Sequence, residues 1–194
     1  PSVAVDAAVF GVDDYKSSTM DEKILKILLV KRGEEPFRDM YALPGGFLRK
    51  NETAEEAVHR ELAEEAGVAD SKIIPLKVYS GKNRDPRGWI ISAAFISLTN
   101  TVELSTAADS DAANAEWLSI RWKVTDKSEK LIISDDETTL EIIADDGKII
   151  KSVFLFYHFI IIYDAFKKLQ DEVRYHDIIF DLMPEFFTVS DLHG

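Results

Sequence analysis

Short segments that are either continuously apolar or alternate between apolar and polar residues recur along the first 150 residues. Segments of this length, rich in β-branched residues and bounded by turn residues, predict β-strands. Strands are expected at 3–10, 24–30, 72–80, 89–98, 116–122, 131–133, 140–143 and 148–150. Asp146 and Gly147, between the last two segments, are typical of a hairpin turn.

Helical spacing predicts three helices, at 53–66, 152–174 and 177–183. Thr53 and Glu56 have the spacing of a capping box, and Gly67 stands where a left-handed C-terminal cap belongs. Strands mixed with helices favour a layered α/β or α+β architecture. We expect one main domain over residues 1–150, including the added hairpin region, followed by C-terminal helices over 151–194.

The composition is that of an ordinary globular domain, with 46% hydrophobic and 30% charged residues. There are 23 Lys and Arg against 35 Asp and Glu, so the net charge is −12. Phosphate backbones need clustered basic residues, so this chain alone is not expected to bind nucleic acid. The chain contains no cysteine, which excludes disulfides and thiolate metal sites.

The longest apolar stretch, residues 153–163, has 11 residues and contains His158. A membrane span needs roughly 20 apolar residues, so this stretch predicts a buried helix, in which His158 is packed or hydrogen-bonded. The N-terminus has no basic region followed by an apolar one, so no secretory signal is expected. These features favour a cytoplasmic protein without a membrane partner.

Two glutamates of the 53–66 helix fall on its apolar side. On a helical wheel, Glu61 and Glu65 lie inside the arc formed by Ala57, Val58 and Leu62, and Glu64 lies at its edge. A solvated acidic helix is the simpler interpretation, but it would place these carboxylates on the opposite face. Because buried carboxylates need a partner, the pattern favours a hard divalent cation such as Mg²⁺ or Mn²⁺.

The loop before this helix contains Leu43-Pro44-Gly45-Gly46. Glycines allow close backbone approach, and a helix N-terminus favours anions. Such glycines more often make a simple turn, but beside a carboxylate cluster they suggest a metal-bound phosphate or pyrophosphate.

Residues 46–68 resemble the Nudix box, G-x5-E-x7-R-E-U-x-E-E-x-G-U, in which U is aliphatic. The named positions are filled without a mismatch by Gly46, Glu52, Arg60, Glu61, Leu62, Glu64, Glu65, Gly67 and Val68. The strand pattern extends the resemblance to roughly residues 3–122. It implies a Nudix α/β/α sandwich with a mixed sheet, to which extra hairpin strands and C-terminal helices are added. It also implies Mg²⁺-dependent hydrolysis of a nucleoside diphosphate derivative.

The resemblance also implies roles for the residues of the box. Glu61 and Glu65 would be the principal metal ligands, the Gly45 carbonyl a further ligand, and Glu64 a ligand or an aid to water activation. Arg60 would orient the glutamates. The resemblance further implies that Glu52 ties the loop to the helix. The general base stays open between Glu64 and a carboxylate of the later acidic loop, for which Glu103, Asp109 and Asp111 are candidates.

Residues 35–47 and the turn 83–88 look like the ADP-ribose pyrophosphatase branch of this family, and especially like the Nudix-related repressors of NAD metabolism. Arg84 and Arg87 suit phosphate or ribose recognition, although the turn could also be a solvated basic loop. Arg38, Tyr41 and Gly46 are further candidates for substrate contacts. The aromatic ring could instead serve packing.

The C-terminal segment also resembles these repressors, in which a winged-helix DNA-binding domain follows at about the point where this sequence ends. The resemblance is therefore compatible with two functions. The first is a Mg²⁺- or Mn²⁺-dependent ADP-ribose pyrophosphatase. The second is an ADP-ribose-sensing domain of a repressor with little or no turnover, whose DNA contacts would come from the added domain. The resemblance favours a homodimer in both cases.

Overall fold

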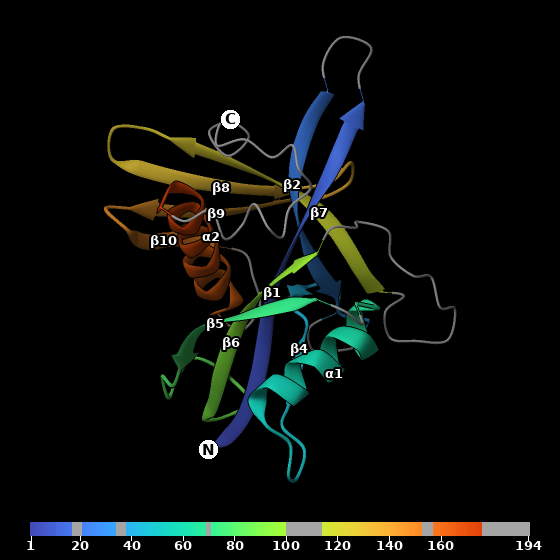
Figure 1. Ribbon diagram of the computed structural model, residues 1–194. Helices are drawn as coiled ribbons and strands as arrows, with labels where there is room; N and C mark the ends of the chain where they lie inside the picture. The colour runs from blue at the N-terminus through green and yellow to red at the C-terminus, as the bar shows by residue number, and fades with distance from the viewer. Residues whose placement is uncertain (17–20, 34–37, 69–70, 100–113, 153–156, 176–194) are drawn as a thin grey trace.

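A computed structural model describes residues 1–16, 21–33, 38–68, 71–99, 114–152 and 157–175. Within these ranges the chain forms ten strands and two helices (Figure 1). Their bounds are β1 Ser2–Lys16, β2 Asp21–Lys31, β3 Tyr41–Ala42, β4 Gly45–Phe47, α1 Ala54–Ala66, β5 Lys72–Tyr79, β6 Ile90–Thr99, β7 Ala115–Val124, β8 Ser128–Ser134, β9 Thr139–Asp145, β10 Lys148–Ser152 and α2 His158–Tyr175.

The strands form one mixed sheet with β1 near its centre. Its order is β10-β9-β8-β7-β2-β1-β6-β5, with β3 paired to β2 and β4 paired to β1. β1 runs parallel to β6 and antiparallel to β2 and β4. The expectation of a mixed sheet is therefore confirmed. The short strand β4 brings the glycine loop directly onto β1.

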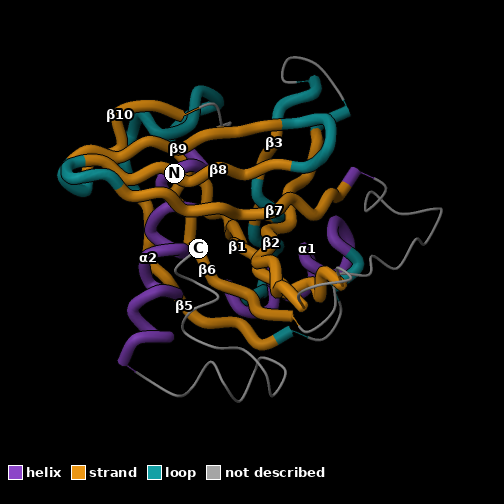
Figure 2. Tube along the Cα trace, turned by 90° about the horizontal axis from the view of Figure 1, so that it is seen from above, coloured by secondary structure: helices purple, strands orange, loops and turns teal. Residues whose placement is uncertain are grey.

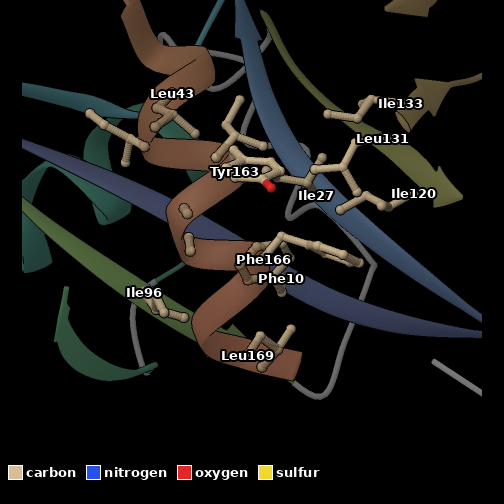
Figure 3. Close-up of a cluster of buried hydrophobic side chains, with 14 of the residues drawn as sticks. Phe10, Ile27, Leu43, Ile96, Ile120, Leu131, Ile133, Tyr163, Phe166 and Leu169 are labelled. Atoms are coloured by element: carbon tan, nitrogen blue, oxygen red, sulfur yellow. The ribbon is translucent and has the colours of Figure 1, made fainter. Parts of the chain in front are cut away.

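The two helices cover opposite sides of the central strands (Figure 2). The period of two in a strand explains this arrangement, because successive side chains of β1 point to opposite faces. Val5, Ala7 and Val9 pack in a cluster with α1, whereas Ala8 and Phe10 pack in the larger cluster that contains α2. Figure 3 shows the larger cluster, in which side chains of α2 lie against the strands. The α/β/α sandwich is confirmed.

All the expected strands are present, and most are longer than their apolar patterns. β1 reaches Lys16 and β8 begins at Ser128 because pairing continues through polar residues once a neighbour is in register. The turn between β9 and β10 has positive φ at both Asp146 and Gly147, 46° and 71°. Positive φ at both central residues is the geometry that favours Asp-Gly in two-residue hairpins, so this prediction is confirmed.

Helix α1 begins and ends as its caps predict. The Thr53 side chain accepts a hydrogen bond from Glu56 N, the Glu56 side chain accepts one from Thr53 N, and Gly67 has φ 65°.

The expected start of the C-terminal helix is wrong. The strand expected at 148–150 continues through Ser152 as β10, because Lys151 and Ser152 still pair with Ile143 and Ile142 of β9. Tyr157 then has φ 60°, which no right-handed helix allows, so α2 begins only at His158. The expected helix at 177–183 lies outside the described residues. The division at residue 150 stays a prediction, although α2 packs into the same cluster as the sheet.

Within the described ranges, no helix is both long enough and apolar enough to cross a membrane.

Candidate functional site

Helix α1 presents its glutamates to the protein at three different depths. Glu61 is buried, with 8% of its surface exposed, although it is a carboxylate. Glu65 is half-buried, and Glu64 is exposed. The helical wheel therefore placed Glu61 correctly, whereas Glu65, which it also placed on the buried side, is only half-buried. The axial rotation of α1 follows from burial of Leu62 and Val58 against β1.

Arg60 compensates the buried carboxylate charge on this helix. Its guanidinium makes two hydrogen bonds to Glu52, of 2.6 and 2.9 Å. The Nη1 nitrogen also donates to Glu61 Oε1 and, at 3.3 Å, to Glu64 Oε2. Nη2 reaches the carbonyl of Phe47 at 3.2 Å. One side chain therefore joins the loop after β4 to two glutamates of α1.

These contacts change the pKa values of Glu52 and Arg60. Hydrogen bonds from Arg60, and from the Arg49 amide, lower the pKa of Glu52 to about 2. The bonds to Glu52, and then to Glu61, raise the pKa of Arg60 above its usual value although burial opposes this. Glu52 and Arg60 are therefore both charged over the whole range in which the protein would work.

The two glycines of β4 are required by close approach. A Cβ on Gly46 would lie 2.2 Å from Glu61 Oε1, and a Cβ on Gly45 would lie 2.2 Å from the carbonyl oxygen of Val5. Gly45 N donates to Glu65 Oε2 at 2.9 Å. Because Gly45 and Gly46 have no side chains, the loop can lie directly against β1 and Glu61. The Glu65 carboxylate then binds the loop to α1.

A pocket of about 240 Å³ opens beside this loop. One wall contains Gly45, Gly46, Phe47 and Glu65. Facing residues come from β1, from the turn before β6 and from the start of α2. They are Ala4, Asp6, Arg84, Asp85, Arg87, Ile90 and His158, and Val30, Arg32, Ala42 and Leu43 complete the lining. Glycine loop, glutamate and both arginines of the 83–88 turn therefore meet in one pocket.

Arg84 is the most unusual residue of this pocket. Only 9% of it is exposed, and within the described residues its Nε and Nη1 atoms have no hydrogen-bond partner. Nη2 makes one long contact, 3.4 Å, to the carbonyl of Ile90. A buried cationic group with unused donors is costly unless something else satisfies it. An anion in the pocket would satisfy it.

Arg87 is held differently, through Asp85. Its Nε and Nη2 donate to the Asp85 carboxylate at 3.0 and 2.7 Å, and its guanidinium lies 5.6 Å from the ring centre of Phe47. Burial alone would raise the pKa of Asp85, but the bonds from Arg87 outweigh it and lower that pKa. The turn is thus a structured element, closed by the bond from Gly88 N to Asp85 O. Within it Arg84 and Asp85 are buried, whereas Arg87 is exposed.

The other residues named from the sequence lie elsewhere. Arg38 is exposed and does not line the pocket. Tyr41 is buried, and its hydroxyl donates to Glu116 at 2.6 Å. Burial, and then the bond to Glu116, raise the pKa of Tyr41 to about 12. The candidate bases Glu103, Asp109 and Asp111 lie outside the described residues.

Sequence reasoning missed four polar residues of the pocket lining, namely Asp6, Arg32, Asp85 and His158. Asp6 was visible as a single charge inside the apolar strand 3–10, and His158 as a single polar residue inside the apolar stretch 153–163. An isolated polar residue in an otherwise buried segment is the signal that could have found both.

The donor set fits a hard divalent cation. Glu61, Glu64 and Glu65 supply carboxylate oxygens, and the Gly45 backbone beside them supplies a carbonyl, which are the ligand types that Mg²⁺ and Mn²⁺ prefer. Only glycine at position 46 lets the Glu61 carboxylate come this close to the loop. Among the described residues, no three acidic, His or Cys side chains converge on one point, and Arg60 donates to both the Glu61 and the Glu64 carboxylates.

Comparison with known proteins identifies the fold and the box. The NUDIX domain model matches residues 8–133, which is more than half of the chain. The chain belongs to the NUDIX family. Members of this family typically use a divalent metal.

Two of the relatives that match this chain are named for different activities. ADP-ribose pyrophosphatase of Methanocaldococcus jannaschii is 43% identical over 120 residues, covering 62% of this chain and 63% of that protein. The ADPR responsive transcriptional repressor NtrR of Acinetobacter baylyi is 27% identical over 196 residues, covering 100% of this chain and 64% of the repressor. A MutT/nudix family protein from Enterococcus faecalis has a similar crystal structure, with TM-score 0.75, 28% identity, and coverage of 94% of this chain and 67% of that one. The NUDIX chain described here thus spans less than two thirds of both curated relatives.

Proposed function

We propose that this NUDIX protein is a Mg²⁺- or Mn²⁺-dependent hydrolase that cleaves the pyrophosphate of ADP-ribose or of a related nucleoside diphosphate derivative. The observation that carries the proposal is the pocket between the glutamate helix and the arginine turn. Among the described residues, the Nε and Nη1 atoms of its buried Arg84 have no hydrogen-bond partner. Gly45, Gly46 and Glu65 line the same pocket. The 43% identity to an ADP-ribose pyrophosphatase supports the same substrate class.

The chain's own residues would bind and orient the diphosphate. Arg84 and Arg87 would contact phosphate or ribose oxygens, and Arg84 would contribute more because its guanidinium is buried. Gly46 lines the pocket and leaves room for a phosphate next to the backbone. Substrate contacts of Arg38 and Tyr41 stay predictions, since neither residue lines this pocket.

Glu61, Glu64, Glu65 and the Gly45 carbonyl would hold the cation. When bound, a divalent cation neutralises pyrophosphate charge and lowers the pKa of a water molecule that it coordinates. Arg60 would keep Glu61 and Glu64 oriented, and Glu52 would keep Arg60 in place. The residue that accepts the proton of the attacking water stays open between Glu64 and the carboxylates Glu103, Asp109 and Asp111.

A substrate panel tests the proposal. Purified protein with Mg²⁺ or Mn²⁺ is offered ADP-ribose, other nucleoside diphosphate sugars and nucleoside triphosphates, and products are separated by chromatography. We expect AMP and ribose 5-phosphate from ADP-ribose, at a higher kcat/KM than for any triphosphate. A preference for triphosphates would contradict the proposal.

The second candidate is an ADP-ribose-sensing domain with little or no turnover. One observation favours it: the repressor relative is similar over all 194 residues, including α2, whereas the pyrophosphatase relative matches 62% of the chain. Binding of ADP-ribose with micromolar or tighter Kd, without product after prolonged incubation, would favour the sensor. Under this candidate, DNA binding requires a longer protein, and this acidic chain alone should not shift duplex DNA in a gel. We also propose a homodimer, which sedimentation would test.

A further inference from the structure

Four buried groups form a line of polar contacts from β6 to the loop before Gly45. Ser92 Oγ, on β6, donates to Asp6 Oδ2 on β1. Asp6 Oδ1 lies 3.5 Å from Nε2 of His158, the first residue of α2. The backbone N–H of Leu43 then donates to His158 Nδ1 at 2.9 Å. None of these residues exposes more than 7% of its surface.

The direction of the contacts fixes the state of the imidazole. Because Nδ1 accepts a hydrogen bond from an amide, it carries no proton, so the proton of the neutral ring is on Nε2, which faces Asp6. Burial lowers the pKa of His158, although the Asp6 carboxylate opposes this, which favours the neutral ring. His158 thus accepts a hydrogen bond from the loop, and its Nε2 faces the Asp6 carboxylate of β1 at 3.5 Å.

The Leu43 amide has a special place in the glycine loop. Pro44 has no N–H, so between Ala42 and Gly45 the backbone offers a single donor, at Leu43. The carbonyl of Pro44 accepts from Ala7 N at 2.9 Å, and Gly45 pairs with Asp6. The loop is therefore fixed on β1 after Leu43, while His158 fixes it at Leu43. In Figure 3 the Leu43 side chain lies beside the N-terminal half of α2.

We propose that His158 is a positioning residue for the glycine loop: its Nδ1 holds the Leu43 amide and thereby sets the path on which Gly45 and Gly46 face the pocket and Glu65. The residue lies 115 positions from Leu43 in the chain and joins the loop to a helix outside the Nudix box. The catalytic consequence rests on the proposed function, whereas the effect on the loop does not.

Two substitutions separate the two nitrogens of the ring. In His158→Asn, the side-chain oxygen can take the place of Nδ1 and accept from Leu43 N. In His158→Gln, the amide nitrogen can take the place of Nε2 and donate to Asp6, but no acceptor remains near Leu43. Both changes keep a neutral polar side chain, so they differ mainly in which contact survives.

The test measures amide hydrogen exchange at Leu43 and steady-state kinetics with ADP-ribose. We expect His158→Gln to speed exchange at Leu43 by about tenfold or more, and to lower kcat by about 10-fold with a smaller change in KM, as is usual when a group that orients a site is lost. His158→Asn should keep the exchange protection and recover most of the lost kcat. Unchanged exchange in His158→Gln, or equal effects of both variants, would overturn the inference.

A control excludes general loosening of α2. Leu169→Val shortens a buried side chain on the same helix, at the end of α2 away from Leu43 (Figure 3). It should leave Leu43 exchange and kcat at wild-type values. A fall in kcat equal to that of His158→Gln would show that any damage to α2 suffices, and it would overturn the positioning role. If the wild type shows no turnover, the proposed function fails, and hydrogen exchange alone still decides whether His158 holds the loop.

Discussion

Two sides of the proposed site differ in how their charges are satisfied. The glutamate wall consists of Glu52, Arg60, Glu61, Glu64 and Glu65, of which Glu65 lines the pocket, and the arginine wall is built around Arg84 and Arg87. On the glutamate wall, Arg60 donates to Glu52, Glu61 and Glu64, all of which lie within nine residues of it in the chain. On the arginine wall, Arg87 is paired with Asp85, but within the described residues two nitrogens of Arg84 have no partner. The charged groups of the glutamate wall have hydrogen-bond partners, whereas Nε and Nη1 of Arg84 have none among the described residues.

This difference indicates what each wall contributes. The carboxylates around the Arg60 guanidinium form a negatively charged surface. A divalent cation would have to draw oxygens of Glu61 and Glu64 away from Arg60. Unused donors on a buried arginine gain hydrogen bonds only when an anion arrives, so they contribute to affinity. A cation-bound diphosphate complements both walls at once. Substitutions on the glutamate wall should therefore lower turnover, and substitutions on the arginine wall should lower affinity.

The largest expected effect is on the glutamate wall, at Glu65. In Glu65→Gln the side-chain oxygen still accepts from Gly45 N, so the loop contact and the fold are retained, but the negative charge is lost. We expect kcat to fall by about 10²–10³-fold, the scale for removing one group that stabilises charge in a transition state. Turnover of ADP-ribose in saturating Mg²⁺ measures this, with melting temperature as the check on folding.

Glu55→Gln is the matched control, since Glu55 is exposed on the same helix. It should keep wild-type turnover. Equal activity of Glu65→Gln and Glu55→Gln would show that the charge of the inward face has no catalytic role.

The next effect tests how tightly the loop is packed against the glutamate wall. In Gly46→Ala, the new Cβ would lie 2.2 Å from Glu61 Oε1, so the carboxylate or the loop must move. We expect about 1–3 kcal/mol of destabilisation, the usual range for overpacking, together with a several-tenfold loss of turnover. Urea unfolding and kcat measure the two effects.

Gly81→Ala provides the comparison, because the atom nearest to a new Cβ at this position is 4.0 Å away. This variant should be as stable and as active as the wild type. If both alanine variants behave alike, the close approach of Gly46 to Glu61 does not limit the site.

A substitution on the arginine wall should have a smaller effect. It should change the affinity for ADP-ribose more than the stability of the fold. Arg84→Ala removes the donors that have no partner in the described part of the chain. We expect the Kd for ADP-ribose, measured by calorimetry on a Glu65→Gln background, to rise by roughly tenfold, which corresponds to about 1–2 kcal/mol. Arg121→Ala, at an exposed position on β7, is the control and should bind normally. Unchanged affinity in Arg84→Ala would remove the arginine wall from the substrate site.

The contrast between the walls also explains what could be predicted from the sequence. The glutamate wall is contiguous, so the capping box, the helical wheel and the glycine spacing all report on neighbours in the chain. Thr53, Glu61 and Gly67 accordingly lie where their patterns indicate.

The arginine wall is assembled from β1, the turn before β6 and α2, and no local pattern joins these segments. Arg84 and Arg87 could be suspected from their side chains, but the contacts of Asp6 and His158 depend on the parallel pairing of β1 with β6 and on where α2 begins. The expected helix start at residue 152 was wrong because Ser152 still pairs with Ile142 of β9 and Tyr157 has a positive φ.

The smallest effect tests the ion pair within the glutamate wall through pH. The pKa of Glu52 is lowered to about 2 by Arg60 and by the Arg49 amide, from an ordinary value of 4.5. A lowered pKa means that the folded state favours the charged form, so this contribution to stability is complete above about pH 4.5 and is lost as the pH falls toward 2. Glu52→Gln should therefore flatten the dependence of the unfolding free energy on pH in that window. Because the pair lies near solvent, the change should be modest, and salt should weaken it. Urea unfolding of both proteins between pH 2.5 and 7 measures it, with Glu55→Gln as the variant that removes the same charge from the exposed side of α1. The same flattening in both variants would show that net charge, and not the bond between Glu52 and Arg60, sets the pH dependence.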